Sequence, residues 1–178
     1  LSWQPVGKPL DKYSSICRHG TGYSIIESKY SDIHSEVSYF CPLDKDFEVW
    51  HVYLKNTGKK TRKLSMFTFV EYASNWNAID DMNNLQYTQY ITTMNVLGNF
   101  IDHGTNVNIP ENPGNFQDKD QGRHTFIGLL GGDISAFDTD RDEFIGPYRT
   151  YANPIVVENG KCKNSIGYGD NGCGSLQI

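Results

Sequence analysis

The stretch YSIIESKYSDIHSEVSYFCPLDKDFEVWHVYL (residues 23–54) decides the fold class of this chain. Apolar and polar residues alternate along 23–30, 33–40 and 47–54, and short polar segments separate these three runs. A period of two places successive side chains on opposite faces of a half-buried strand. Three such strands joined by short turns predict an antiparallel meander.

The rest of the chain continues the same theme with interruptions. We expect further strands at 63–72, 87–96, 124–130 and 155–158, and another that begins at 174–178. The segment 75–89 is polar and rich in amides, and the Gly/Pro/Asn-rich stretch 98–122 is expected to be a long loop of the kind that is often functional. Because no helix of more than two turns is expected, the chain is predicted to be mainly β.

Charge and hydropathy exclude two classes of partner. The net charge is -5, and the most basic run, residues 59–63, is expected at the solvated tip of a hairpin. Nucleic-acid binding needs a concentrated basic face, which this sequence lacks. No apolar run approaches the ~20 residues of a membrane-spanning helix, and no signal peptide is visible. We therefore expect neither a nucleic-acid partner nor a membrane.

The cysteines are few and widely spread, at positions 17, 41, 162 and 173. A secreted disulfide domain of this size would usually contain more of them. No CxxC pair occurs, and the spacing supports no metal site with the five histidines. We expect free thiols, no bound metal and a reducing, cytoplasmic location.

Two groups of titratable residues invite a catalytic interpretation. Arg18-His19-Gly20 combines an anion-binding group with one that titrates near neutral pH, but no nucleophile motif surrounds it, so a structural role is favoured. The carboxylates at Asp80-Asp81 and in the segment 138–142 resemble the paired acids of glycoside chemistry. In the second segment, Arg141 is expected to pair with a neighbouring acid and fix a turn.

The best candidate for ligand binding is a set of amides and aromatic rings in the polar middle segment. Amides form hydrogen bonds with sugar hydroxyls, and aromatic rings stack on sugar faces. A polar loop that bonds to itself would have the same composition, so both interpretations stay open. The set comprises Trp76, Asn83, Asn84, Gln86 and Tyr87.

Short motifs occur in a fixed order over essentially the whole chain. They are Trp3-Gln4-Pro5, Arg18-His19-Gly20 with Gly22-Tyr23, Phe40-Cys41-Pro42-Leu43, Leu64-Ser65 through Phe69-Val70-Glu71, Asp80-Asp81, Asn84-Leu85-Gln86, Phe137-Asp138 with Asp140-Arg141, Asn153-Pro154, and Gly160-Lys161-Cys162 to Cys173-Gly174-Ser175-Leu176. In this order they resemble the N-terminal region of the cellobiose and cellodextrin phosphorylases, glycoside hydrolase family 94, formerly glycosyltransferase family 36.

This resemblance implies an antiparallel β-supersandwich of the galactose-mutarotase type. Residues 1–178 would form part of a single N-terminal sandwich domain that is incomplete. In the family an (α/α)6 barrel follows and carries the general acid and the phosphate site, so no catalytic residue is assigned to this chain. Phosphate attacks the anomeric carbon of a β-linked glucoside and gives α-glucose 1-phosphate, with no further cofactor. Family members are usually homodimers, in which the sandwich helps to close the partner's active site.

The resemblance also implies substrate-binding residues, namely Asn84, Gln86, Tyr87 and Trp76. In cellobiose-type members an Arg tends to follow the Gln of this segment, and here Tyr87 stands in that place. A stacking Tyr would suit a longer cello-oligosaccharide. Three alternatives remain open, namely a phosphorylase of N,N'-diacetylchitobiose, a non-catalytic sugar-binding sandwich, and a mutarotase-like epimerase that uses His19 or His34 with a carboxylate.

Overall fold

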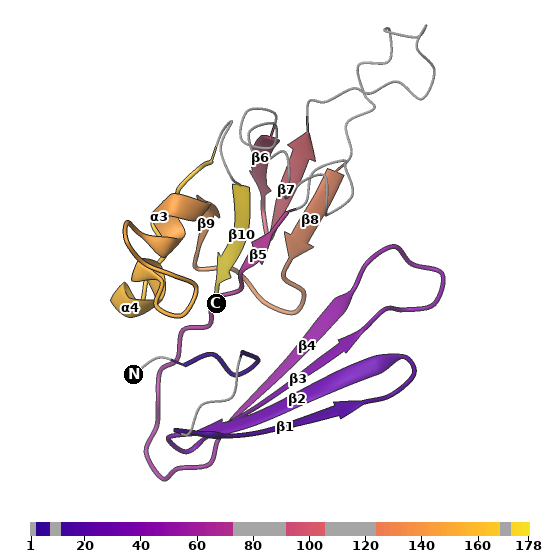
Figure 1. The fold of residues 1–178 in the computed structure, drawn as a ribbon, viewed down its shortest axis with the longest axis vertical. Coiled ribbons are helices and arrows are strands. Elements are labelled where there is room, and N and C mark those ends of the chain that lie inside the picture. The colour runs from indigo at the N-terminus through magenta and orange to yellow at the C-terminus, as the bar shows by residue number, and fades with distance from the viewer. Residues whose placement is uncertain (1–2, 8–11, 73–91, 106–123, 168–171) are drawn as a thin grey trace, which may run out of the picture. The chain divides into compact units, whose positions relative to one another are not determined.

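The computed structural model describes residues 3–7, 12–72, 92–105, 124–167 and 172–178. The chain divides into two compact units, Leu1–Leu64 and Ser65–Ile178, and each is considered by itself. Both are built mainly from antiparallel strands, which confirms the predicted fold class (Figure 1).

The first unit is a four-stranded antiparallel sheet whose strands lie in sequence order. Its strands are β1 (Ser14–His19), β2 (Tyr23–Tyr30), β3 (Ile33–Phe40) and β4 (Val49–Asn56). The three strands predicted from residues 23–54 are confirmed, since β2 and β3 match to the residue and β4 is shifted by two. Ile33, Ser35 and Val37 alternate as the buried residues of β3, because a strand directs every second side chain to the same face.

The β2–β3 turn is tied to the segment that follows β4. Ser31 and Asp32 have φ values of 50° and 63°, which suit a two-residue hairpin turn. Thr57 donates through its amide and its hydroxyl to the Asp32 carbonyl, and Arg62 donates to the Ser31 carbonyl. Residues 59–63 are exposed, as predicted, but they do not form a hairpin tip, because β4 pairs only with β3 and no later described strand joins its sheet.

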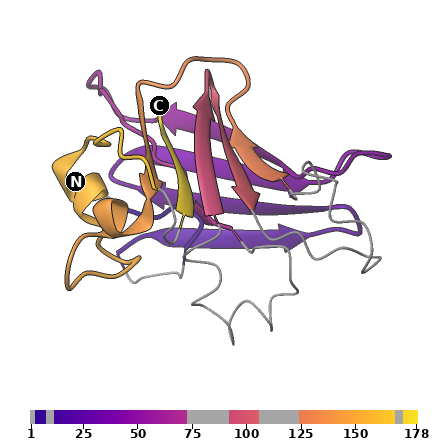
Figure 2. The same cartoon turned by 90° about the horizontal axis from the view of Figure 1, so that it is seen from above.

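The described residues of the second unit form two three-stranded antiparallel sheets. One has the order β5 (Val70–Glu71), β10 (Gly172–Gln177), β9 (Ala136–Asp140), and the other β6 (Thr92–Leu97), β7 (Phe100–Thr105), β8 (His124–Gly128). The short helices α3 (Arg141–Ile145) and α4 (Ile155–Asn159) lie beside the β10 sheet, on the side away from β6–β8 (Figures 1 and 2). β10 is buried along its whole length and is the central strand of this unit.

Two apolar clusters hold the second unit together. Leu176 of β10 packs with Met94 of β6 and Ile101 of β7, so this cluster joins the two sheets. Phe144 and Val156 belong to the other cluster, which packs the helices against the β10 sheet. Burying a large apolar side chain stabilises a fold by about 1.5–3 kcal/mol.

One predicted strand is a helix. Residues 155–158 were expected to be a strand because Ile and Val are β-branched, yet they form α4. Pro154 precedes the first turn with φ −60°, and Gly160 ends the helix in the left-handed conformation at φ 73°. Proline at the start and glycine just past the end of a segment favour a helix. Full burial of Val156 against the core stabilises the helix further.

A strand also occurs where a loop was predicted. Residues 98–122 were expected to be one long loop, but β7 occupies 100–105 of that stretch, and 106–123 lie outside the described residues. Gly98 and Asn99 form a two-residue connection between β6 and β7, with Gly98 at φ 62°. The predicted strand at 63–72 is shorter than expected. Only Val70–Glu71 is regular, although Met66 and Thr68 also bond to the β10 segment.

Candidate functional site

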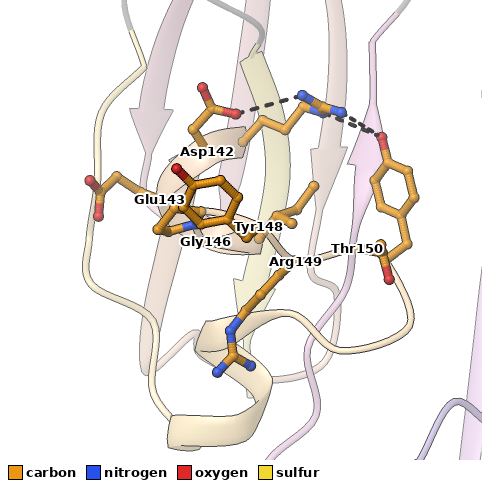
Figure 3. A pocket seen from close by; sticks show the side chains of 10 residues that line it. Asp142, Glu143, Gly146, Tyr148, Arg149 and Thr150 are labelled. Carbon is orange, nitrogen blue, oxygen red and sulfur yellow. Dashed lines mark hydrogen bonds and ion pairs between the residues drawn. The ribbon is translucent and has the colours of Figure 1, made fainter.

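The pocket at α3 is the candidate site that the described residues form. It has a volume of about 690 Å³ and is lined by residues 141–151, with the exception of Phe144 (Figure 3). The Asp140 carboxylate starts α3 by accepting hydrogen bonds from the amides of Asp142 and Glu143, at 2.9 and 3.1 Å. Gly146 ends the helix at φ 89°, a conformation that glycine adopts readily. The chain then turns and forms the other wall.

A three-residue network ties one wall of this pocket to β5. Arg141 Nε donates to Glu71 Oε1, and the Tyr151 hydroxyl donates to the same oxygen at 2.6 Å. Arg141 Nη2 also donates to the Tyr151 hydroxyl at 3.1 Å, and Arg141 Nη1 lies 3.6 Å from Asp142 Oδ1 (Figure 3). The prediction that Arg141 pairs with a neighbouring acid is confirmed. Its principal partner, Glu71, comes from a distant strand.

The network keeps Arg141 charged and Tyr151 neutral near neutral pH. The hydrogen bond with Tyr151 and the one with Glu71 raise the pKa of Arg141. Burial and the hydrogen bond to Glu71 raise the pKa of Tyr151. Neither group is thereby prepared for proton transfer, which requires a pKa near the working pH. Arg141 and Tyr151 therefore position chain segments and do not supply an acid or a base.

The second arginine of the pocket is engaged as well. Arg149 pairs with Glu158 of α4 and donates to the Asn153 carbonyl at 3.2 Å, and Figure 3 shows its side chain directed away from Asp142. Tyr148 is fully exposed and has φ 59°. Among its described lining residues, the pocket therefore presents an exposed ring and hydrogen-bonding groups, while both arginines already have carboxylate partners.

The cluster of acids at 138–142 divides into separate structural roles. Asp138 is completely buried, and its carboxylate accepts hydrogen bonds from the amides of Lys163 and Ser165 and from the Ser165 hydroxyl at 2.7 Å. A carboxylate that accepts several hydrogen bonds is held by them and is costly to disturb. Asp140 caps α3, as described above. The other predicted acid pair, Asp80-Asp81, lies outside the described residues.

The predicted sugar-binding residues Trp76, Asn84, Gln86 and Tyr87 also lie outside the described residues. The described part of the chain ends at Tyr72, immediately before the segment 73–91 that contains these four residues. Glu71 is held by the network at α3, and the Tyr72 ring stacks on His103 with 4.6 Å between ring centroids. Glu71 and Tyr72, which lead into residues 73–91, are thus fixed by different elements of the second unit, Glu71 by the α3 network and Tyr72 by β7. Sequence reasoning missed this because the partners lie far apart along the chain.

Histidine–carboxylate pairs, which the sequence did not reveal, occur in both units. His34 Nε2 lies 3.3 Å from Glu27 Oε2, and His124 Nδ1 lies 2.9 Å from Asp102 Oδ1. His19 contacts no carboxylate within the described residues and bonds instead to Cys17 and Ser24. None of these histidines lines the pocket at α3. Within the described ranges, no three His, Cys, Asp or Glu side chains gather as metal ligands.

The helices were also compared with the requirements of a membrane-spanning segment. In the part of the chain that the structure describes, no helix has the length and apolar character that crossing a bilayer requires. All four cysteines lie in this part and carry free thiols, those of Cys17 and Cys41 exposed and those of Cys162 and Cys173 buried.

Comparison with known proteins decides the family. The profile of the supersandwich domain of glycosyl hydrolase 94 matches residues 1–178. The chain belongs to glycoside hydrolase family 94. This membership confirms the supersandwich fold that the motif order implied.

Individual members of family 94 show how closely the chain is related to known phosphorylases. It is 35% identical over 176 residues to N,N'-diacetylchitobiose phosphorylase of Vibrio proteolyticus, a match that covers 99% of the chain and 21% of that protein. It is 26% identical over 167 residues to solabiose phosphorylase of Paenibacillus borealis (92% of the chain, 20% of that protein). A 3-O-beta-D-glucopyranosyl-beta-D-glucuronide phosphorylase of Paenibacillus borealis is 25% identical over 180 residues (99% and 22%). The chain thus spans about a fifth of the length of these family 94 relatives.

Proposed function

We propose that this chain is the supersandwich region of an inverting glycoside phosphorylase. The enzyme would cleave a β-linked disaccharide or oligosaccharide with inorganic phosphate and release an α-sugar 1-phosphate. The match to a family 94 domain over residues 1–178 carries this proposal, and the phosphorylase names of the relatives support it. Phosphate is the co-substrate, and no further cofactor is proposed.

No catalytic residue is proposed within this chain. The two arginines of the α3 pocket are held in ion pairs, and the general acid and the phosphate site would come from a helical barrel outside residues 1–178. The chain would contribute acceptor contacts through Trp76, Asn84, Gln86 and Tyr87, and would help to close the active site of a second subunit in a homodimer. The free thiols support a cytoplasmic location for this enzyme.

The substrate class can be ordered by similarity. N,N'-Diacetylchitobiose is the first substrate to test, because phosphorylases of that name reach 34–35% identity with the chain, compared with 25–26% for the other two named activities. Cellobiose and longer cello-oligosaccharides are the second, on the strength of the motif order and of Tyr87. The two possibilities differ in the donor sugar, N-acetylglucosamine or glucose.

The deciding experiment is phosphate-dependent release of sugar 1-phosphate by the intact protein. N,N'-Diacetylchitobiose, cellobiose and cellotriose are each incubated with and without phosphate, and the anomeric form of the product is read by phosphorus NMR. An α-anomeric product from any of the three supports the proposal, and its identity fixes the donor. A folded protein that releases no sugar phosphate from any of them would favour a non-catalytic sugar-binding sandwich.

A further inference from the structure

Strand β1 brings a thiol, an imidazole and a hydroxyl together on one face of the first unit. Cys17 and His19 are two residues apart on the strand, so both side chains leave the same face. Cys17 Sγ lies 3.2 Å from His19 Nε2, and His19 Nδ1 lies 2.8 Å from the hydroxyl oxygen of Ser24, which is directly opposite His19 on β2. The cysteine is exposed.

This arrangement has the geometry of an activated nucleophile. Such a site needs a nucleophile within hydrogen-bonding reach of a base, and a third group that orients the base. The two contacts are compatible with a neutral ring that carries its proton on Nδ1 and donates it to the Ser24 oxygen. Nε2 is then the acceptor for the thiol proton. Gln or Asn could not replace His19 in this role, because an amide does not take up a proton near neutral pH.

The neighbours of the thiol on the adjacent strand are uncharged. On the face that carries Cys17, the neighbours from β2 are Ile26, directly opposite, and Ser24 and Ser28 on the diagonals, none of which is charged. The acid nearest in register, Glu27, points to the opposite face, where Arg18 pairs with it. No carboxylate from β1 or β2 therefore faces the thiol.

The other thiols lack this arrangement and serve as internal references. Cys41 is exposed but makes no hydrogen bond within the described residues. Cys162 and Cys173 are 1% and 0% exposed. Thiol reactivity depends on both access and thiolate character. Only Cys17, among these four, combines exposure with a neighbouring base.

We propose that Cys17, with His19 as its base, is a site of reversible thiol–disulfide exchange with small disulfides. The thiol passes its proton to His19 Nε2, and Sγ attacks one sulfur of the disulfide. The disulfide S–S bond breaks as the new S–S bond forms, and the departing thiolate takes the proton back from the imidazolium. The products are a mixed disulfide at Cys17 and one small thiol, so excess thiol reverses the reaction.

The test uses the intact protein, glutathione disulfide as the probe, and peptide mass spectrometry after acid quenching. Cys17 should form the mixed disulfide about tenfold faster than Cys41, or more. His19→Gln should bring the two rates to within about twofold, with the Cys41 rate unchanged. His34→Gln, on the other face of the same sheet, is the matched control and should leave both rates unchanged.

Two results would overturn the proposal. One is a wild-type protein in which Cys17 reacts no faster than Cys41. The other is a folded His19→Gln variant that keeps the wild-type ratio of rates. If circular dichroism shows that His19→Gln does not fold, Ser24→Ala replaces it, because the base stays while its orienting partner is lost. An unchanged ratio in a folded Ser24→Ala variant would then count against the site.

Discussion

Glu71 and Arg141 stand 70 residues apart in sequence and form an ion pair in the second unit. The pair joins the end of β5 to the start of α3, and the Tyr151 hydroxyl completes it through a hydrogen bond to the same carboxylate oxygen. Because the chain enters residues 73–91 just after Glu71, this contact fixes the point from which the predicted sugar-binding segment departs.

The Tyr151 hydroxyl gives the cleanest test of that network. Tyr151→Phe keeps the ring that packs on Phe69 and removes only the group that bonds to Glu71 and Arg141. The free energy of unfolding should fall by about 1 kcal/mol, since the network is partly exposed. Tyr53→Phe, at an exposed position of β4, is the control and should change it by less than about 0.5 kcal/mol. Urea unfolding measures both, and equal effects would contradict the assigned role.

Gly174 in β10 should tolerate no side chain. A Cβ there would lie 2.4 Å from the Tyr72 hydroxyl and 2.6 Å from Ile127 Cγ2. Gly174→Ala should therefore lower the free energy of unfolding by about 1–3 kcal/mol through overpacking. At Gly132 the nearest atom, Leu129 Cδ2, would be 3.9 Å from the new Cβ, so Gly132→Ala should be close to neutral. Comparable urea midpoints for the two variants would show that β10 accommodates the methyl group.

The buried thiols make the stability of the second unit sensitive to alkaline pH. Burial and the nearby Asp138 charge raise the pKa of Cys162 to about 12, and burial raises that of Cys173 further. In the unfolded chain a thiol ionises near pH 8.5, so the unfolded state loses its proton first. Stability is thus fully present below about pH 8.5 and falls as the pH rises towards the folded pKa, by up to about 1.4 kcal/mol per pH unit for each thiol.

Removing one thiol should reduce this dependence. Between about pH 9 and 11, the free energy of unfolding should fall less steeply with pH in Cys162→Ala than in the wild type. The difference in slope should be the contribution of one thiol, up to about 1.4 kcal/mol per pH unit. Cys41→Ala, which removes an exposed thiol, is the control variant. Urea unfolding across this range provides the measurement. A slope that is identical in the wild type and in Cys162→Ala would refute the assignment.

Acceptor length is predicted to depend on Tyr87. In the intact enzyme, Tyr87→Arg replaces a stacking ring with a charged group that has several hydrogen-bond donors. The ratio of kcat/KM for cellobiose to that for cellotriose should rise by about tenfold, because a site is selective through the contacts it makes in the transition state. Phosphorolysis rates with both sugars provide the measurement. An unchanged ratio would remove Tyr87 from the acceptor site.

The strands could be predicted from the sequence where apolar and polar residues alternate without interruption. Residues 23–54 predict their three strands through this alternation, which the burial follows in β3, whereas β4 is exposed along nearly its whole length. The pattern failed at 155–158, where three β-branched residues are helical. There, Pro154, Gly160 and the burial of Val156 outweigh intrinsic preference. It also failed at β7, where the Gly98-Asn99 hairpin turn was taken for the start of a loop.

The side-chain contacts at the sites were harder to predict from the sequence than the fold. The partnership of Arg141 with an acid could be expected from its neighbours, but Glu71 and Tyr151 come from segments whose proximity only the tertiary fold creates. The contact between Cys17 and His19 follows from alternation along one strand. Ser24, which completes it, required the register of β1 against β2. The family could be recognised because its motifs extend over the whole chain.

The unequal burial of the four thiols equips the protein with a native reporter of local opening. Cys162 and Cys173 lie in the core of the second unit, whereas the two thiols of the first unit are exposed. A permeant alkylating reagent can reach the buried pair only when that core opens, so their labelling rate measures the opening free energy of one unit alone. Cys41, which is exposed and has no neighbouring base among the described residues, calibrates the intrinsic reaction rate in the same sample. The opening of the second unit can thus be measured without introducing a probe.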